Sequence, residues 1–235
     1  MKFPATPRLA EFCAGLAFLF FSLSAVAAEP DAENAGQKAA MLCAACHGVD
    51  GNSTLPANPV LAGQLPETLL KELNDFRRAD GKPAARNNDV MGAMSAVLSD
   101  EDRRILSIYF SRQKPVPPTL DASPAPNTSP EDAGTAHVAP PEFSERAKTA
   151  QVLWRRGDFD RRIPACAGCH GTTGKGLPSQ NPRVAGQHSE YSVAQLKNYR
   201  SGKRANDREK IMRTIAEKLS DKEIDALSEL VAGLR

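Results

Sequence analysis

The stretch "CAACHGVD" at residues 43–50 returns as "CAGCHGTT" at residues 166–173, 123 positions further along the chain. Both stretches contain the pattern C-x-x-C-H, and together they hold four of the five cysteines in the 235 residues. The residues of the two patterns are Cys43, Cys46 and His47, then Cys166, Cys169 and His170. Two cysteines of this kind at a fixed distance from a histidine indicate a specific chemical site rather than a disulfide framework.

Other segments repeat at the same offset. "NPVLAGQ" at 58–64 matches "NPRVAGQ" at 181–187, again 123 residues apart. The first copy then carries two extra residues near position 80, and the offset becomes 121. At that offset "MGAMSAVLSDED" at 91–102 matches "MRTIAEKLSDKE" at 212–223. The chain is therefore a tandem duplication of one unit.

The N-terminus is typical of an export signal. Lys2 and Arg8 give a positive start, an apolar run follows at 13–28, and Ala25-Val26-Ala27 matches a cleavage site. The apolar run is shorter than the roughly 20 residues that a membrane-spanning helix needs. We therefore predict a cleaved signal peptide at 1–28 and a mature protein in the periplasm. Cleavage would remove Cys13, which leaves only the two C-x-x-C pairs.

Composition divides the remaining chain into three parts. We expect a first domain at 29–114, a linker at 115–141 that is rich in proline, and a second domain at 142–235. Proline restricts the backbone and favours extended structure, so the linker should be semi-rigid. The sequence leaves open whether the two domains dock on each other or move on this linker.

The periodicity within each unit is helical. Leu69, Leu70, Leu73 and Phe76 recur at helical spacing after Pro66. "LSDED" at 98–102 and "LSDKE" at 219–223 both begin with the spacing of a helix capping box. No stretch shows sustained strand alternation. The predicted fold class is all-α, with two small tandem domains.

The pattern C-x-x-C-H predicts covalent attachment of c-type haem. Two thiols one helical turn apart can each add to a haem vinyl group, and the following histidine then ligates the iron. The alternative, a thioredoxin-like redox pair, requires a βαβ context that is absent here. We expect two haem c groups, one per domain. Each would also stabilise a domain that is too small to bury a large apolar core.

The sixth iron ligand distinguishes an electron carrier from an enzyme. An iron whose six coordination positions are all filled by the haem and the protein cannot bind substrate. Met91 lies 44 residues after His47, and Met212 lies 42 residues after His170. These methionines are equivalent at the 121-residue offset, so we predict that they are the ligands. Met94 matches Ile215 instead, which indicates an ordinary core position.

Charge is unevenly distributed between the domains. The whole chain has a net charge of +2, which argues against nucleic-acid binding. Residues 142–235 have 18 Lys and Arg against 12 Asp and Glu, whereas residues 29–114 have 10 against 12. This asymmetry is either an ordinary solvated surface or a dipole that orients docking on a redox partner. We expect His137 and His188 to have surface positions.

The two C-x-x-C-H-G motifs, each followed by N-P-x-x-A-G-Q, a methionine and L-S-D-x and then an acidic residue, resemble the cytochrome c4 family. "IPACAGCHGTTGKG" at 163–176 and "LKNYRSGKRAND" at 196–207 are especially similar to its second domain. The resemblance implies class I cytochrome c domains whose haems face each other across the domain interface. It also implies that the carbonyls of Pro59 and Pro182 bind the ring N–H of His47 and His170.

One difference between the copies bears on their haem environments. Tyr109 and Phe110 in the last helix of the first unit correspond to Leu230 and Val231 in the second. We expect the second domain to lack this aromatic packing, so the two haems should have different environments.

Three functions follow from this pattern. The leading prediction is an electron carrier without catalytic activity that links a quinol-oxidising complex or a dehydrogenase to a terminal oxidase. These partners are implied by the family resemblance. The sequence does not decide whether the protein also associates peripherally with a membrane surface. The alternatives are a dihaem subunit of a larger periplasmic dehydrogenase and a dihaem peroxidase, which would need one open iron.

Overall fold

The computed structural model describes residues 30–78, 83–116, 141–177 and 181–235. The predicted signal peptide, most of the predicted linker and His137 lie outside these residues. Within them the chain is helical, with isolated β-bridges and no strand. The predicted all-α fold class is therefore confirmed.

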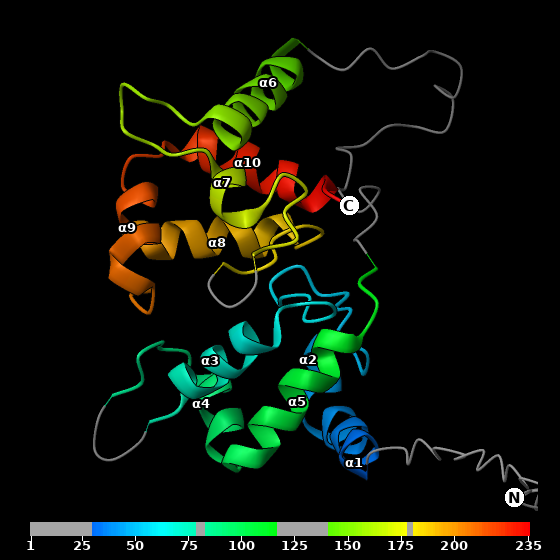
Figure 1. Ribbon diagram of the computed structural model, residues 1–235. Coiled ribbons are helices and arrows are strands. Elements are labelled where there is room, and N and C mark those ends of the chain that lie inside the picture. The colour runs from blue at the N-terminus through cyan, green and yellow to red at the C-terminus, as the bar shows by residue number, and fades with distance from the viewer. Residues whose placement is uncertain (1–29, 79–82, 117–140, 178–180) are drawn as a thin grey trace, which may run out of the picture.

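The two units contain the same sequence of helices. The first has α1 (Pro30–Lys38), α2 (Ala44–His47), α3 (Pro66–Phe76), α4 (Asp89–Ala96) and α5 (Asp100–Arg112), with a π-helical turn at Ala39–Cys43. The second has α6 (Pro141–Arg156), α7 (Cys166–His170), α8 (Ser189–Arg200), α9 (Ile211–Ala216) and α10 (Asp221–Gly233), with a 3₁₀ turn at Arg208–Lys210. Figure 1 shows these two helical groups one above the other.

Local sequence signals set the helix ends. The structure confirms the helix after Pro66, which occupies its first turn, and buries Leu69 and Phe76 on it. Both capping boxes form as predicted, at the start of α5 and of α10. In each box a serine hydroxyl accepts a backbone N–H, and an acidic side chain three residues later accepts the N–H of that serine.

The last helix of each unit is the centre of its core. α5 packs on α1 and α3, and α10 packs on α6 and α8. Leu106 on α5 and Ile224 on α10 are fully buried. The buried residues that cluster with them are Ala39, Leu69, Leu98 and Phe110 in the first unit, and Ala150, Leu153, Ile163, Leu219, Ala226 and Leu227 in the second.

A glycine turn after each C-x-x-C-H folds the chain back on itself. Gly51 has φ of 77°, and its carbonyl accepts the N–H groups of Leu61 and Ala62 at 2.8 and 3.1 Å. A Cβ at Gly51 would lie 2.9 Å from the Ala62 nitrogen, so only glycine fits here. Gly174, its counterpart in the second unit, makes the equivalent bonds with φ of 70°. The turn returns the N-P segment toward the histidine.

The last helix of the second domain lacks the aromatic pair of the first, as expected, but an aromatic residue from another helix makes the equivalent contact. In the first domain, the Tyr109 hydroxyl donates to the Val49 carbonyl at 3.0 Å. In the second, the buried Trp154 donates from Nε1 to the Thr172 carbonyl at 3.1 Å. Val49 and Thr172 are 123 residues apart, so the same carbonyl is bound in both copies. Trp154 comes from α6 rather than from the last helix, which the comparison of the last helices could not show.

The two domains contact each other through α3, α8 and the segments beside them (Figure 1). Glu72 on α3 and its counterpart Gln195 on α8 are 123 residues apart. Arg86 donates to both of these side chains, and so does Arg204, with N···O distances of 2.5–3.0 Å. This resolves the open question in favour of docked domains.

The contact has approximate two-fold symmetry. The guanidinium of Arg86 lies 4.6 Å from the ring centroid of Phe76, and that of Arg204 lies 4.6 Å from the ring of Tyr199. Phe76 and Tyr199 are again counterparts in the duplication. Arg86 and Arg204 have matching roles in this contact, although they are 118 positions apart and are not counterparts in the duplication. The domain interface is therefore approximately isologous, with the two rings from counterpart positions and the two arginines from different ones.

Candidate haem sites

Each C-x-x-C-H motif forms one tight helical turn. Cys43 ends the π-helical turn and Cys46 and His47 lie on α2, while Cys166, Cys169 and His170 all lie on α7. None of these four cysteines forms a disulfide. Cys46 and Cys169 are exposed, whereas burial raises the pKa of Cys43 and of Cys166 to about 11. Both thiols of each pair are therefore available for thioether bonds.

The two histidines are held by equivalent backbone carbonyls. His47 Nδ1 lies 2.9 Å from the Pro59 oxygen, and His170 Nδ1 lies 2.9 Å from the Pro182 oxygen. This is the arrangement that the family resemblance implies. A carbonyl only accepts, so the proton is on Nδ1 and the lone pair is on Nε2. Burial lowers the pKa of both histidines, which favours this neutral form. A neutral imidazole with a fixed Nδ1–H is the form that ligates a metal.

The two predicted methionines lie at equivalent helix starts. Met91 is in the first turn of α4, where the Asn88 side chain accepts its backbone N–H at 2.9 Å. Met212 is in the first turn of α9, directly after Glu209 and Lys210, which have φ of 52° and 61°. Both methionine side chains are half-buried.

The helices that carry the methionines do not pack mainly on those that carry the histidines. Among the described elements, α4 packs chiefly on α3, and α9 packs chiefly on α8. Each methionine therefore lies on a helix other than the one that carries the histidine of its domain.

Apolar side chains beside these motifs remain exposed. Leu42, Val49 and Leu55, which flank His47 in the sequence, have exposed fractions of 39%, 51% and 46%. Leu177 and Ile211 of the second domain have exposed fractions of 43% and 46%. A flat apolar prosthetic group would cover surface of this kind, so the residues present fit haem at both sites.

Two predictions for individual residues are wrong. Met94 is 38% exposed and is not an ordinary core residue. α4 buries the neighbouring Ser95, and Met94 lies about 100° around the helix from it. His188 is buried rather than at the surface, and its Nε2 lies 2.8 Å from the Ser53 carbonyl of the other domain. The position of His188 at the domain interface explains its burial, and comparison with Leu65, its counterpart, gave no signal of it.

Several interface residues were missed, among them two glutamines as well as Glu72, Gln195, Arg86 and Arg204. The side chains of Gln64 and Gln187 cross the interface and bind backbone groups of the opposite domain. Both belong to the repeated A-G-Q motif, so the repetition was a signal that could have identified them.

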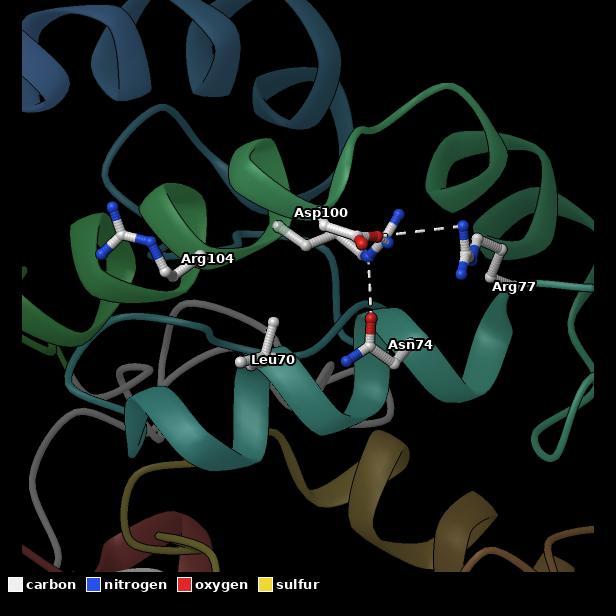
Figure 2. A pocket seen from close by; sticks show the side chains of 6 residues that line it. Leu70, Asn74, Arg77, Asp100 and Arg104 are labelled. Carbon is white, nitrogen blue, oxygen red and sulfur yellow. Dashed lines mark hydrogen bonds and ion pairs between the residues drawn. The ribbon is translucent and has the colours of Figure 1, made fainter. Parts of the chain in front are cut away.

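A separate hollow on the first domain lies between α3 and α5 (Figure 2). Arg103 on its wall is buried and donates to the Asn74 side chain at 2.7 Å, to the Leu98 carbonyl at 2.5 Å and to Asp100. Its lining has no cysteine, histidine, serine or threonine that could serve as a nucleophile or metal ligand: Leu70, Asn74, Arg77, Asp100, Arg103 and Arg104. The hollow lies where Arg103 of α5 bonds to Asn74 of α3.

Known proteins share both the sequence and the fold. A family model described as cytochrome c matches residues 33–113 and 159–235. The cytochrome c4 of Azotobacter vinelandii is 39% identical over 206 residues, which cover 85% of this chain and 88% of that protein. The chain belongs to the cytochrome c4 family.

Two further relatives agree with this membership. The crystal structure of reduced cytochrome c4 from Pseudomonas stutzeri matches with a TM-score of 0.71 and 37% identity, over 87% of this chain and 98% of that one. A protein named thiosulfate dehydrogenase electron acceptor, from Stutzerimonas stutzeri, is 36% identical and covers 94% of this chain and 93% of its own.

Membership in the cytochrome c4 family establishes the cofactor. The protein carries two covalently bound haem c groups, one per domain, and its function is dihaem electron transfer. In the part of the chain that the structure describes, no helix has the length and apolarity to cross a membrane. The same residues contain no group of three His, Cys, Asp or Glu side chains for a further metal ion.

Proposed function

We propose that this protein is an electron carrier without catalytic activity of its own, in which two protein ligands close each iron. Thioether bonds join the first haem to Cys43 and Cys46, and its iron ligands are His47 and Met91. The second haem is attached through equivalent residues, namely Cys166, Cys169, His170 and Met212. Iron held by histidine and methionine has a raised reduction potential and no position for a substrate.

The paired bonds from His47 to Pro59 and from His170 to Pro182 carry this proposal. Each bond fixes the plane of an imidazole and directs its Nε2 away from the carbonyl. A ligand held in this way moves little when the iron changes oxidation state. Small movement favours fast electron transfer, and the equivalent geometry in both domains argues against a special catalytic haem.

The proposal also covers the location of the protein and its redox partners. Residues 1–28 act as an export signal, and the mature protein works in the periplasm with domains at 29–114 and 142–235. A quinol-oxidising complex or a dehydrogenase donates electrons, and a terminal oxidase accepts them. The excess of Lys and Arg in the second domain favours docking on an acidic partner surface.

A second candidate is the role of dedicated acceptor for thiosulfate dehydrogenase. The relative named for that role, which covers nearly the whole chain, favours it. Rapid mixing of the oxidised protein with reduced thiosulfate dehydrogenase would test it. Reduction within milliseconds supports this partner, whereas slow reduction together with fast oxidation by a terminal oxidase supports the general carrier.

Binding of carbon monoxide to the dithionite-reduced protein tests whether each iron has two protein ligands and no free coordination position. At neutral pH we expect no change in the visible spectrum, because both irons have two protein ligands. A stoichiometric change at one haem would contradict the proposal and would favour a dihaem peroxidase.

A further inference from the structure

A single peptide group in each domain binds both its own histidine and the opposite domain. In the first domain this is the group between Pro59 and Val60. Its carbonyl accepts from His47 Nδ1 at 2.9 Å, and its N–H donates to Gln187 Oε1 at 2.9 Å. His47 is therefore connected to the second domain through two hydrogen bonds and one peptide group.

The second domain repeats this arrangement in the opposite direction. The peptide group between Pro182 and Arg183 accepts from His170 Nδ1 at 2.9 Å and donates to Gln64 Oε1 at 2.8 Å. Val60 and Arg183 are counterparts in the duplication, as are Gln64 and Gln187. The same hydrogen bonds occur between counterpart residues in both domains. This repetition indicates that the arrangement is a property of the domain interface.

Each glutamine is held in place by further bonds. The Gln187 amide group donates from Nε2 to the Val60 carbonyl at 3.1 Å, and its oxygen also accepts the backbone N–H of His188 at 3.1 Å. Gln64 makes the same two kinds of bond, to the Arg183 carbonyl at 2.8 Å and from the Leu65 N–H at 2.9 Å. The two side chains are thus fixed with their oxygens on the peptide groups.

Hydrogen bonds in series through a peptide group strengthen one another. An acceptor on the N–H moves electron density toward the carbonyl oxygen of the same group. A more negative carbonyl then binds the imidazole N–H more strongly, and this raises the basicity of the histidine as a ligand. A more basic ligand stabilises ferric over ferrous iron and so lowers the reduction potential.

We propose that Gln64 and Gln187 are crossed positioning residues, each of which sets the reduction potential of the haem in the opposite domain. Gln187 acts on the first haem through the Pro59–Val60 group, and Gln64 acts on the second through the Pro182–Arg183 group. The docking of the domains thereby sets both potentials. This inference rests on the proposed function, in which His47 and His170 ligate the irons.

The test uses Gln187→Leu and Gln64→Leu in the full-length protein with both haems. Spectroelectrochemical titration measures the two potentials, and NMR contacts of the haem ring protons assign each haem to its domain. We expect Gln187→Leu to raise the potential of the first haem more than that of the second, and Gln64→Leu to do the reverse. The Nδ1 proton signal of the histidine in the opposite domain should also move to lower chemical shift.

Glu72→Gln is the matched control, because it weakens the interface without changing either peptide group or glutamine. We expect it to shift both potentials in the same direction. Equal shifts of the two haems in both Leu variants, or a shift confined to the domain that carries the substitution, would overturn the proposal.

The same samples separate this inference from the proposed ligation. In the oxidised protein, ring protons of an iron-bound histidine have large paramagnetic shifts. If His47 and His170 lack such signals, the proposed ligation fails, and the crossed effect fails with it. If the signals are present but neither Leu variant shifts mainly the potential of the haem in the opposite domain, the proposed ligation stands and only the effect of the glutamines is wrong.

Discussion

Glu72 of the first domain accepts a hydrogen bond from Arg204 of the second domain at 2.7 Å. The same carboxylate accepts from Arg86, so one negative charge lies between two guanidinium groups. At the equivalent position, Gln195 binds the same two arginines without a charge. The interface is thus nearly symmetric in geometry and asymmetric in charge. Glu72 supplies the negative charge that interacts with the two arginines.

Glu72→Gln is expected to weaken the docking of the domains. The three side chains have exposed fractions of 11–19%, so the two arginines would keep their charge with little water to solvate it. Loss of one partner from a buried ion pair costs about 3–5 kcal/mol, and we expect the lower end here. Guanidinium denaturation measures the change in unfolding free energy, and small-angle scattering measures the separation of the domains.

Lys148→Gln provides the comparison for Glu72→Gln. Its ion pair with Glu145 is largely exposed, with side-chain fractions of 69% and 74%. Exposed pairs contribute about 0–1 kcal/mol, so this variant should remain close to the wild type. Equal losses in the two variants would show that Glu72 has no special role in docking.

Acid should separate the domains through the same carboxylate. Burial alone would raise the pKa of Glu72, but Arg204 and Arg86 outweigh burial and hold its pKa below the ordinary value of 4.5. A carboxyl whose pKa is lowered on docking stabilises the docked state above pH 4.5, and this contribution is lost as the pH falls through the lowered pKa. Small-angle scattering between pH 7 and pH 3 should show expansion in the acid range.

The groups around Glu72 allow a clear comparison. Glu72 is the group of this cluster whose lowered pKa ties docking to acid. In Glu72→Gln the weakened docking should already be present at pH 7 and should change little with acid. An acid expansion of the same size in this variant would assign the effect to another carboxyl.

Local features of the fold could be predicted from the sequence, and contacts between the domains could not. The capping boxes of α5 and α10 involve residues three positions apart, so their chemistry can be read within a short window. The bond from Gln64 to Arg183 joins residues 119 apart, and that from His188 to Ser53 joins residues 135 apart. Neither partner has a local pattern that identifies the other.

The family resemblance gave a correct prediction where both copies use the same residue types, at the bonds from His47 and His170 to proline carbonyls. Comparison of the two copies missed a contact where they use different residues for the same task. Tyr109 and Trp154 bind equivalent carbonyls from different helices, and a comparison of aligned positions cannot detect such an exchange.

Trp154→Phe is expected to destabilise the second domain by about 2 kcal/mol. It removes the bond to the Thr172 carbonyl and leaves a cavity at a side chain that is 4% exposed. Tyr109→Phe removes only the equivalent hydrogen bond to Val49 and should cost the first domain about 1 kcal/mol. Guanidinium denaturation, followed at the haem bands of each domain, measures both losses. A larger loss in Tyr109→Phe would contradict the equivalence of the two side chains.

Met91→Ala is expected to open the first iron, because α4 would no longer supply its sixth ligand. The reduced variant should bind one carbon monoxide per protein, and the potential of that haem should fall, since methionine ligation raises it. Met94→Ala is the matched control on the same helix: Met94 is 38% exposed and lies almost a full turn from Met91. This control should bind no carbon monoxide and should keep both potentials. If Met94→Ala bound carbon monoxide and Met91→Ala did not, the ligand would be Met94, and the alignment of Met91 with Met212 would not reflect a shared role.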